Sequence, residues 1–473
     1  MKGKIHFWIL IGFILINSLI YWPTLFEPTS YGDECIYLTL GQGFNQGLVF
    51  YRDIHDNKPP FLYLVAAFSH QLPVFRFLAL IWKLIGLILI GELAYQLSKK
   101  WLATLLSLLT FTLGYLFFEG KVANGEIFMM TPAIAAIYLF WIKRKALSPT
   151  RAILIGALFA LGFLFKVPVF FDFLALLTAL FFPEIKNLKK KVFWGLILGF
   201  TLPIILSIIY YALQGAFTPY VRSALLQNIG YLSSWQGSNQ GLFIRGLLLM
   251  IATFGLWRLK SRLSFDLYFI SLWFIFALFG ALLSARPYPH YLIQIVPALS
   301  LLIGLISKPK AKSLLLAGAA LSLVIAVYHL FHFWWYPLWP DYQKTLSYLT
   351  GQIDKENYLK LWGERTAENY HLAQFIRQTT SPQERIFVWG EASCIYALSQ
   401  RLPPGRYTVN YHLFDFNGFQ ETLAAIQKTR PKLIIKMIDE SRSWPELDQL
   451  LSRDYRRLIK PDLKDQIYLR IGP

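Results

Sequence analysis

Long apolar segments fill residues 1–340 and restrict the fold of this chain more than any other feature. At a rise of about 1.5 Å per residue, most of them are long enough to cross a bilayer as helices. With 55% hydrophobic residues and a mean hydropathy of +0.44, the chain carries more apolar surface than a soluble core could bury. The sequence therefore predicts a polytopic α-helical membrane protein.

The apolar segments divide into about eleven predicted spans. They cover residues 5–22, 74–97, 101–118, 127–142, 153–165, 169–182, 192–213, 242–257, 265–283, 291–306 and 314–335. Lys2 and Lys4 precede the first span, but no small-residue cleavage site follows it. We therefore predict a membrane anchor there and not a cleaved signal peptide.

Clusters of lysine and arginine orient the predicted spans. With a cytoplasmic N-terminus, every multi-residue basic cluster lies on the cytoplasmic side, as the positive-inside rule requires. The clusters lie at residues 99–100, 143–145, 186–191, 258–262 and 308–312. A net charge of +19 would suggest nucleic acid as the partner of a soluble protein. Here it follows from cytoplasmic loops, so the sequence predicts a plasma (inner) membrane protein with no nucleic-acid partner.

The sequence changes character after residue 335, where shorter apolar segments alternate with amphipathic ones. Residues 385–389, 407–411, 432–438 and 467–471 read as strands, and residues 368–378, 419–428 and 444–451 read as helices. Alternating strands and helices predict a small α/β domain with a partly parallel sheet. We expect a transmembrane domain over residues 1–340 and a soluble domain over residues 341–473, which lies outside because an odd number of spans precedes it.

Cys35 and Cys394 are the two cysteines of the chain, and they lie far apart in the sequence. Neither has a neighbouring histidine or cysteine at the spacing of a zinc site. The sequence shows no disulfide framework, so two free thiols are predicted.

Acidic residues are rare before Pro340, and seven of the eleven there fall in the first two predicted outer loops. A transporter or proton relay would place carboxylates within the spans. Glu92 and Asp172 are the candidates for such a role, and no internal repeat supports a transporter. A solvated loop surface is the simplest interpretation of the outer acids.

Three motifs in the predicted outer loops are more specific than a charged surface. Asp33-Glu34 follows the first span, and the same loop ends in Lys58-Pro59-Pro60. Asn124-Gly125-Glu126 lies in the second loop, and Arg286 begins the segment RPYPHY, which includes His290 and Tyr291. Together they resemble the lipid-phosphate-sugar glycosyltransferases of the GT-C superfold. That group includes the protein O-mannosyltransferases, the aminoarabinose transferases of lipid A and rhizobial lipopolysaccharide-core enzymes.

The resemblance implies a GT-C fold and a glycosyltransferase of the cell envelope that transfers a hexose or pentose. Since nucleotide sugars are made in the cytoplasm, the implied donor is a polyprenyl-phosphate-linked sugar that has crossed the bilayer. The acceptor is a lipid, glycan or protein, and the transfer inverts the anomeric carbon. No cofactor is implied.

The matched motifs also suggest catalytic residues. Asp33 is the expected base for the acceptor hydroxyl, Glu34 orients the acceptor or pairs with a cation, and Glu126 is the second-loop acid. Some family members carry an aspartate where this chain has Glu126 or Asn124, so the partner of Asp33 stays open. Without the resemblance, Asp33 reads as the N-cap of a helix over residues 34–42.

Basic residues in the same loops are candidates for the donor phosphate. Lys58 is the first choice, because the two prolines after it fix the backbone; snorkelling at the interface is the alternative. Arg52, Arg286, His290 and Tyr291 are further candidates, although His290 could equally belong to an aromatic belt. Arg222 and Tyr231 could contact the donor or the acceptor.

Two other readings of the whole chain stay open. One is a transporter or flippase for a lipid-linked or polysaccharide precursor, and the other is an inactive scaffold with an outward sensor domain. His55, Asp53 and Asp56 could also bind a divalent cation, but a hydrated loop cluster is the simpler interpretation, and no obligatory metal is predicted.

Overall fold

A computed structural model describes residues 2–182, 190–227, 240–308, 311–336, 338–460 and 463–472. Tyr231 and the basic residues Lys186, Lys189 and Lys310 lie outside these ranges. The chain forms two compact units that interleave along the sequence. One comprises Met1–Trp22, Arg76–Tyr210 and Leu225–Leu338, and the other Pro23–Phe75, Tyr211–Ala224 and Trp339–Pro473. The domain boundary near residue 340 stays a prediction.

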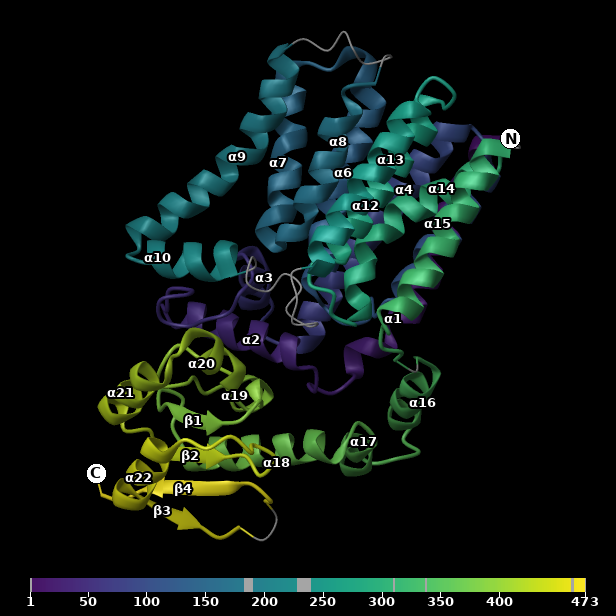
Figure 1. The fold of residues 1–473 in the computed structure, drawn as a ribbon. Coiled ribbons are helices and arrows are strands. Elements are labelled where there is room, and N and C mark those ends of the chain that lie inside the picture. Colours follow the sequence, from purple (N-terminus) through teal and green to yellow (C-terminus); the bar gives the residue numbers. More distant parts are fainter. Residues whose placement is uncertain are drawn as a thin grey trace. The chain divides into compact units, whose positions relative to one another are not determined.

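The first unit is a helical bundle, and each of the eleven predicted spans corresponds to a helix (Figure 1). In the described residues, six helices are long and apolar enough to cross a membrane, and the others are shorter apolar helices. The helices are α1 (Lys2–Tyr21), α4 (Leu72–Ser98), α5 (Trp101–Phe117), α6 (Gly125–Lys143), α7 (Pro149–Phe165), α8 (Phe170–Ala179), α9 (Lys190–Leu213), α12 (Gln240–Arg258), α13 (Phe265–Ala281), α14 (Val296–Leu305) and α15 (Ala311–Leu330). The prediction of a polytopic helical membrane protein is confirmed.

Two of these helices are preceded by 3₁₀ turns, and both are shorter than the predicted spans. The turn η3 (Val167–Val169) comes before α8, and η7 (Pro289–Ile295) comes before α14. Each turn contains a proline within its first two residues, where the missing N–H costs no helical hydrogen bond.

The second unit contains the first predicted outer loop together with the C-terminal region. Its first segment folds as the 3₁₀ turn η1 (Pro23–Phe26) and the helices α2 (Gly32–Asn45) and α3 (Phe61–Ser69). Residues near the end of α9 form α10 (Phe217–Tyr220) and the π-helical turn η5 (Val221–Leu226). The C-terminal region adds α16 (Leu338–Leu349), α17 (Lys355–Leu361), α18 (Glu364–Thr379), α19 (Ser393–Ser399), α20 (Asn410–Phe416), α21 (Phe419–Thr429) and α22 (Pro445–Asp454).

A four-stranded sheet organises the C-terminal region in the order β1-β2-β4-β3 (Figure 1). Strands β1 (Ile386–Trp389) and β2 (Leu433–Lys436) are parallel, whereas β3 (Tyr455–Leu458) and β4 (Gln466–Arg470) continue the sheet in antiparallel pairs. Alternate residues of β1 face opposite layers. Ile386 and Val388 pack with residues of α18 and α19, and Phe387 and Trp389 pack with residues of α20, α21 and α22. The predicted α/β region with a partly parallel sheet is confirmed.

The strand predicted over residues 407–411 is wrong. The chain is irregular from Arg406 to Val409, and α20 begins at Asn410. Tyr407 and Val409 are buried, and Tyr407 packs in the core that contains Phe387 and Trp389 of β1. Their apolar character therefore reflects packing and not strand pairing. Conversely, β3 was not predicted, because Arg456 and Arg457 give this edge strand no apolar alternation.

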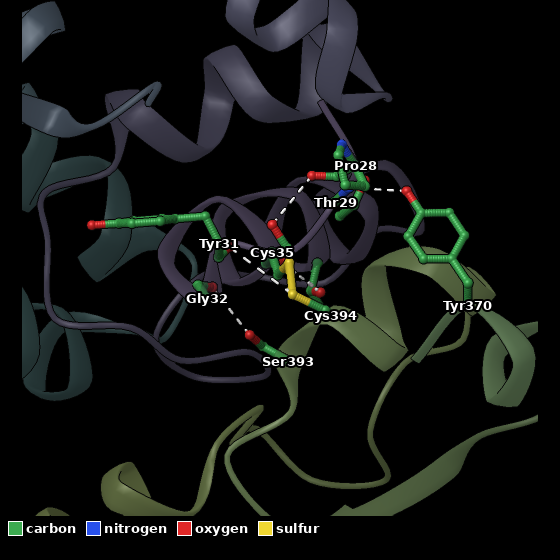
Figure 2. Close-up of a disulfide and its surroundings, with 10 residues drawn as sticks. Pro28, Thr29, Tyr31, Gly32, Cys35, Tyr370, Ser393 and Cys394 are labelled. Atoms are coloured by element: carbon green, nitrogen blue, oxygen red, sulfur yellow. Dashed lines mark hydrogen bonds between the residues drawn. A yellow bond between two sulfur atoms is a disulfide. The ribbon is translucent and has the colours of Figure 1, made fainter. Parts of the chain in front are cut away.

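The prediction of two free thiols is also wrong, since Cys35 of α2 and Cys394 of α19 form a disulfide. Figure 2 shows the bridge beside Ser393, whose hydroxyl donates to the carbonyl oxygen of Gly32 at 3.1 Å. The two cysteines are 359 residues apart, so the sequence alone gave no indication that they meet. The bridge ties the helix that carries Asp33 to the C-terminal sheet region within one unit.

Candidate functional site

Asp33 lies in the first turn of α2, where acidic side chains stabilise the positive end of the helix dipole. The N-cap is Tyr31, which makes no capping hydrogen bond, so the alternative that Asp33 is an N-cap is wrong. Asp33 Oδ2 accepts a hydrogen bond from the Tyr37 hydroxyl at 3.0 Å, one turn further along. About a third of the Asp33 side chain is exposed, whereas Glu34 is fully buried. Asp33 is therefore held in place and reachable from solvent.

Lys58 lies between two carboxylates. Its ammonium nitrogen is 3.8 Å from Asp33 Oδ2 and 3.8 Å from Asp56 Oδ2, and it lies 5.0 Å from the centre of the Tyr37 ring. Tyrosine hydroxyls also hold its backbone: the Lys58 N–H donates to Tyr63 at 2.9 Å, and Tyr51 donates to the Lys58 carbonyl at 2.8 Å. Asp33, the predicted base, and Lys58, the predicted cation for the donor phosphate, thus lie close together.

Asp56 extends this group into the interior of the unit. Its carboxylate is buried, accepts a hydrogen bond from the Tyr63 hydroxyl at 2.9 Å and lies 3.5 Å from His412 Nε2. Burial, together with the Asp56 charge, raises the pKa of the Tyr63 hydroxyl, which therefore stays protonated and keeps donating. His412 was not predicted, since a histidine in a short segment far along the chain carries no sequence signal that relates it to Asp56.

Arg52 is engaged by its neighbour. Its guanidinium donates to both carboxylate oxygens of Asp53 at 2.8 Å and to the carbonyl oxygen of Gln214 at 2.6 Å. Hydrogen bonding from Arg52 lowers the pKa of Asp53. Arg222, from η5, lies over the ring of Phe416 at 5.4 Å. Asp53 is therefore bound to Arg52 and not grouped with His55 and Asp56 as a cation site would require.

In the first unit, Glu126 lies in the first turn of α6, where it is buried and ion-paired with Lys166. The ammonium of Lys166 is also 4.5 Å from the centre of the Tyr291 ring. These three residues line a largely apolar cavity of about 220 Å³ between α6, α8 and α13. Lys166 was not among the predicted site residues; a lysine between two apolar segments was the signal that could have identified it.

His290 pairs with an acid of the second loop. Its Nδ1 is 2.7 Å from Glu119 Oε2, and both side chains are buried. The ring also stacks on Tyr288 and meets Tyr291 edge-on. The alternative that His290 belongs to an aromatic belt stays a prediction. Arg286 begins the same segment, and its backbone N–H donates to the Ser284 hydroxyl at 3.4 Å.

The two acids considered for a transport role are both engaged by neighbours. Asp172 accepts hydrogen bonds from the Trp273 indole at 2.5 Å and from Gln294 at 2.6 Å. Glu92 lies 2.8 Å from His6 Nε2. Such pairing is what a buried polar group needs for stability alone, so neither residue adds support for a transport path.

The predicted site residues divide between the two units. Asp33, Glu34, Arg52 and Lys58 belong to the second unit, and Glu126, Arg286, His290 and Tyr291 belong to the first. Among the residues that the structure describes, no group of three or more histidines, cysteines or acids could hold a metal ion. That the protein requires no metal stays a prediction.

Solved structures provide the comparison for this fold, since no protein-family model and no curated protein match the sequence. The chain is similar to ArnT from Cupriavidus metallidurans bound to undecaprenyl phosphate, with a TM-score of 0.59 and 13% identity over 98% of this chain and 99% of that one. Apo ArnT gives 0.57 and 12%, with 98% of both chains covered. An oligosaccharyltransferase from Archaeoglobus fulgidus matches at 0.45 and 14%, over 91% of this chain and 68% of that one.

Full-length agreement with ArnT defines the class of the protein: it is a polytopic membrane protein with the GT-C fold. The fold implied by the three motifs is confirmed. This chain resembles ArnT over nearly its whole length, and at 13% identity that likeness establishes the fold alone.

Proposed function

We propose that the protein is a membrane glycosyltransferase that moves a sugar from a polyprenyl-phosphate donor to an acceptor at the outer face of the membrane. The fold of ArnT, a protein with undecaprenyl phosphate bound in its crystal structure, supports this function in general. The observation that carries the proposal is the position of Lys58 beside Asp33, since a transferase of this kind needs a cation for phosphate and a base for a hydroxyl.

The proposed reaction is a single displacement. Asp33 takes the proton of the acceptor hydroxyl, whose oxygen attacks the anomeric carbon of the donor sugar. The bond between that carbon and the phosphate oxygen breaks, and polyprenyl phosphate leaves with the bonding electrons. Because the acceptor enters opposite the leaving group, the anomeric carbon is inverted.

Lys58 has two tasks in this scheme. It attracts the donor phosphate and then neutralises the charge that develops on the departing phosphate oxygen. Asp56 keeps a carboxylate beside the ammonium when Lys58 moves from Asp33 toward the phosphate. Release of Lys58 also frees Asp33 of a cation that would make it a weaker base.

The first unit holds a second group of candidate residues, which we consider by itself. The cavity beside Glu126, Lys166 and Tyr291 offers apolar walls together with one ion pair, which suits the junction of a lipid chain with its phosphate. Within this unit, we propose that Glu126 and Lys166 bind substrate and that Arg286, His290 and Tyr291 are candidate contacts to a phosphate.

The outer compartment is favoured by the disulfide between Cys35 and Cys394, because disulfides persist in oxidising compartments and are rare in the cytoplasm. The positive-inside pattern of the loops agrees with this orientation.

A deletion strain and the purified protein together test the proposal. Mass spectrometry of the deletion strain should show a lipid-linked sugar that accumulates and an envelope glycan that lacks the same sugar. The purified protein in nanodiscs should bind undecaprenyl phosphate and, when supplied with the lipid-linked sugar that accumulates in the deletion strain, should restore that sugar to extracted glycans. A flippase would instead leave transfer intact in detergent extracts of the deletion strain, and an inactive scaffold would leave both glycan and lipid pools unchanged.

A further inference from the structure

The C-terminal region contributes one side chain, His412, to the group around Lys58. His412 lies on α20, is fully buried and directs Nε2 toward Asp56 Oδ1 at 3.5 Å. Asp56 Oδ2 is in turn 3.8 Å from the Lys58 ammonium. A continuous series of polar groups thus joins α20 to the predicted phosphate-binding lysine, and all of its members belong to one compact unit.

We propose that His412 is a positioning residue for Lys58: its imidazole holds the Asp56 carboxylate, which fixes the ammonium where the donor phosphate binds. This inference rests on the proposed function, because it assigns His412 a role in donor binding. It also gives the C-terminal region a part in the reaction that the first-loop motifs alone do not indicate.

The burial of Asp56 is the first argument for this role. A buried carboxylate needs several donors to offset its lost hydration. The Tyr63 hydroxyl and the Lys58 ammonium both approach Oδ2, whereas Oδ1 faces His412. Within the described residues, neither Oδ1 nor His412 Nε2 forms a hydrogen bond to a third group. A shift of under about 1 Å would bring the two atoms to the distance of a charge-assisted hydrogen bond.

The rigidity of the surroundings is the second argument. The His412 ring meets His55 edge-on, with ring centres 4.9 Å apart, and it also contacts the ring of Tyr411. His55 is itself fixed, since its backbone N–H donates to the carbonyl oxygen of Arg406 at 2.8 Å. The imidazole therefore has a defined orientation from which it can hold Asp56.

The charge state of the imidazole fits the role. Burial lowers the pKa of His412 to about 4, although Asp56 partly opposes this effect. At neutral pH the ring is uncharged, and the nearby carboxylate favours the tautomer that carries hydrogen on Nε2. An uncharged imidazole can donate a hydrogen bond to Asp56 and does not compete with the Lys58 ammonium for the negative charge of that carboxylate. If the imidazole N–H is removed, Asp56 loses its fixed position, Lys58 is no longer held where the phosphate binds, and the phosphate should bind less well.

Four variants distinguish a role for the hydrogen bond donated by His412 Nε2 from a role of the ring in packing alone. His412→Phe keeps the ring and removes both nitrogens. His412→Gln places an amide N–H near Nε2, whereas His412→Asn places it near Nδ1. His371→Phe is the control, because this half-exposed histidine on α18 pairs with Glu356, away from Lys58. Each variant is made in the full chain, and intact-protein mass spectrometry under non-reducing conditions checks its disulfide.

The measurement is the dissociation constant for undecaprenyl phosphate in nanodiscs, followed by donor KM and kcat for transfer. We expect His412→Phe and His412→Asn to weaken binding about tenfold, the effect of losing one hydrogen bond to a charged group. His412→Gln should stay within about threefold of the natural protein. The kcat at saturating donor should fall less than in Lys58→Ala, since the ammonium and Asp33 are both still present. In an Asp56→Asn background, His412→Phe should have no further effect.

Three results would overturn the proposal. In the first, His412→Phe and His412→Asn both bind undecaprenyl phosphate as tightly as the natural protein. In the second, His412→Gln weakens binding as much as His412→Phe. In the third, His412→Phe still weakens binding in the Asp56→Asn background. If His412→Phe fails to fold, the contrast between Gln and Asn decides the question alone. Failure of the natural protein to bind undecaprenyl phosphate would remove the proposed function itself, and this inference with it.

Discussion

Asp33 and Lys58 lie within ion-pair distance, so each changes the chemistry of the other. The Lys58 ammonium is 3.8 Å from Asp33 Oδ2 and 3.8 Å from Asp56 Oδ2, so it attracts both carboxylates. Donor phosphate in the proposed reaction would draw Lys58 away and leave Asp33 a better base. Substitutions of the two residues should therefore have different effects.

Asp33→Asn should abolish transfer and preserve donor binding, because an amide keeps the shape of the carboxylate but cannot accept the proton. We expect transfer to fall by a factor of about 10² to 10⁴, with the dissociation constant for undecaprenyl phosphate unchanged or lower. Transfer and binding are measured on the same preparation, with Asp448→Asn, an exposed acid of α22, as control. Activity within a few-fold of the natural protein would exclude Asp33 as the base.

Lys58→Ala should weaken binding of undecaprenyl phosphate about tenfold or more and also slow transfer, since both the bound and the departing phosphate lose a cation. Lys58→Arg keeps the charge and should retain part of the binding. Lys436→Ala removes a lysine of β2 that pairs with Asp448 and serves as control. Unchanged donor KM and kcat in Lys58→Ala would place the phosphate site elsewhere.

His412 should make folding sensitive to acid. Burial lowers its pKa to about 4, against about 6.5 in an unfolded chain. Between these values the unfolded chain binds a proton that the folded chain does not, so stability falls as pH falls, by up to about 3 kcal/mol. Thermal unfolding at pH 7 and pH 4.5 should show a smaller loss in His412→Gln than in the natural protein. Equal losses would contradict the assignment.

Glycines set the distance between two helices of the first unit. A Cβ on Gly199 of α9 would lie 2.0 Å from the carbonyl oxygen of Ile153 in α7, and one on Gly156 would lie 2.2 Å from that of Leu196. Gly195 and Gly199 are four residues apart, so they lie on one face of α9. Small residues at this spacing allow membrane helices to approach closely.

Gly199→Ala should therefore destabilise the bundle, although alanine is the better helix former. We expect a net loss of about 1–3 kcal/mol from overpacking, seen as a lower midpoint of thermal unfolding in detergent. Gly255→Ala of α12 is the matched control, because nothing lies within 4 Å of the added Cβ; it should be neutral or slightly stabilising. Equal midpoints for the two variants would show that α7 and α9 can separate without cost.

At the scale of the whole molecule, the disulfide changes how the membrane orientation can be tested. Because Cys35 and Cys394 are bonded to each other, they do not react with a maleimide, and the natural cysteines can stay. Single cysteines are then placed at Ser441, in the C-terminal region, and at Thr150, at the start of α7. Both positions are exposed.

A membrane-impermeant maleimide on intact cells should label Ser441→Cys and leave Thr150→Cys unlabelled until the membrane is permeabilised. The natural protein should be labelled only after reduction and denaturation, because Cys35 and Cys394 are bonded to each other and buried. The reverse pattern, with Thr150→Cys labelled and Ser441→Cys protected, would put Asp33 and Lys58 in the cytoplasm. It would thereby remove the outer-face reaction.

The sequence by itself determined the helices of the bundle, three of the four strands and the presence of Asp33 and Lys58 in one loop. These features depend on local patterns: an apolar segment long enough to span a bilayer, or a short motif whose residues stay close whatever the fold. Even so, the apolar segment at residues 407–411 was assigned to a strand, because apolar character alone does not distinguish pairing from packing.

Only the tertiary structure decided which distant residues meet. The Cys35–Cys394 bridge spans 359 residues, Lys166 reaches Glu126 across a helix pair, and His412 reaches Asp56 from the C-terminal region. No periodicity relates such partners, because their proximity results from the packing of whole helices and a sheet. The sequence thus supplied the groups that the proposed reaction needs, and packing selected the partners that set their charge and position.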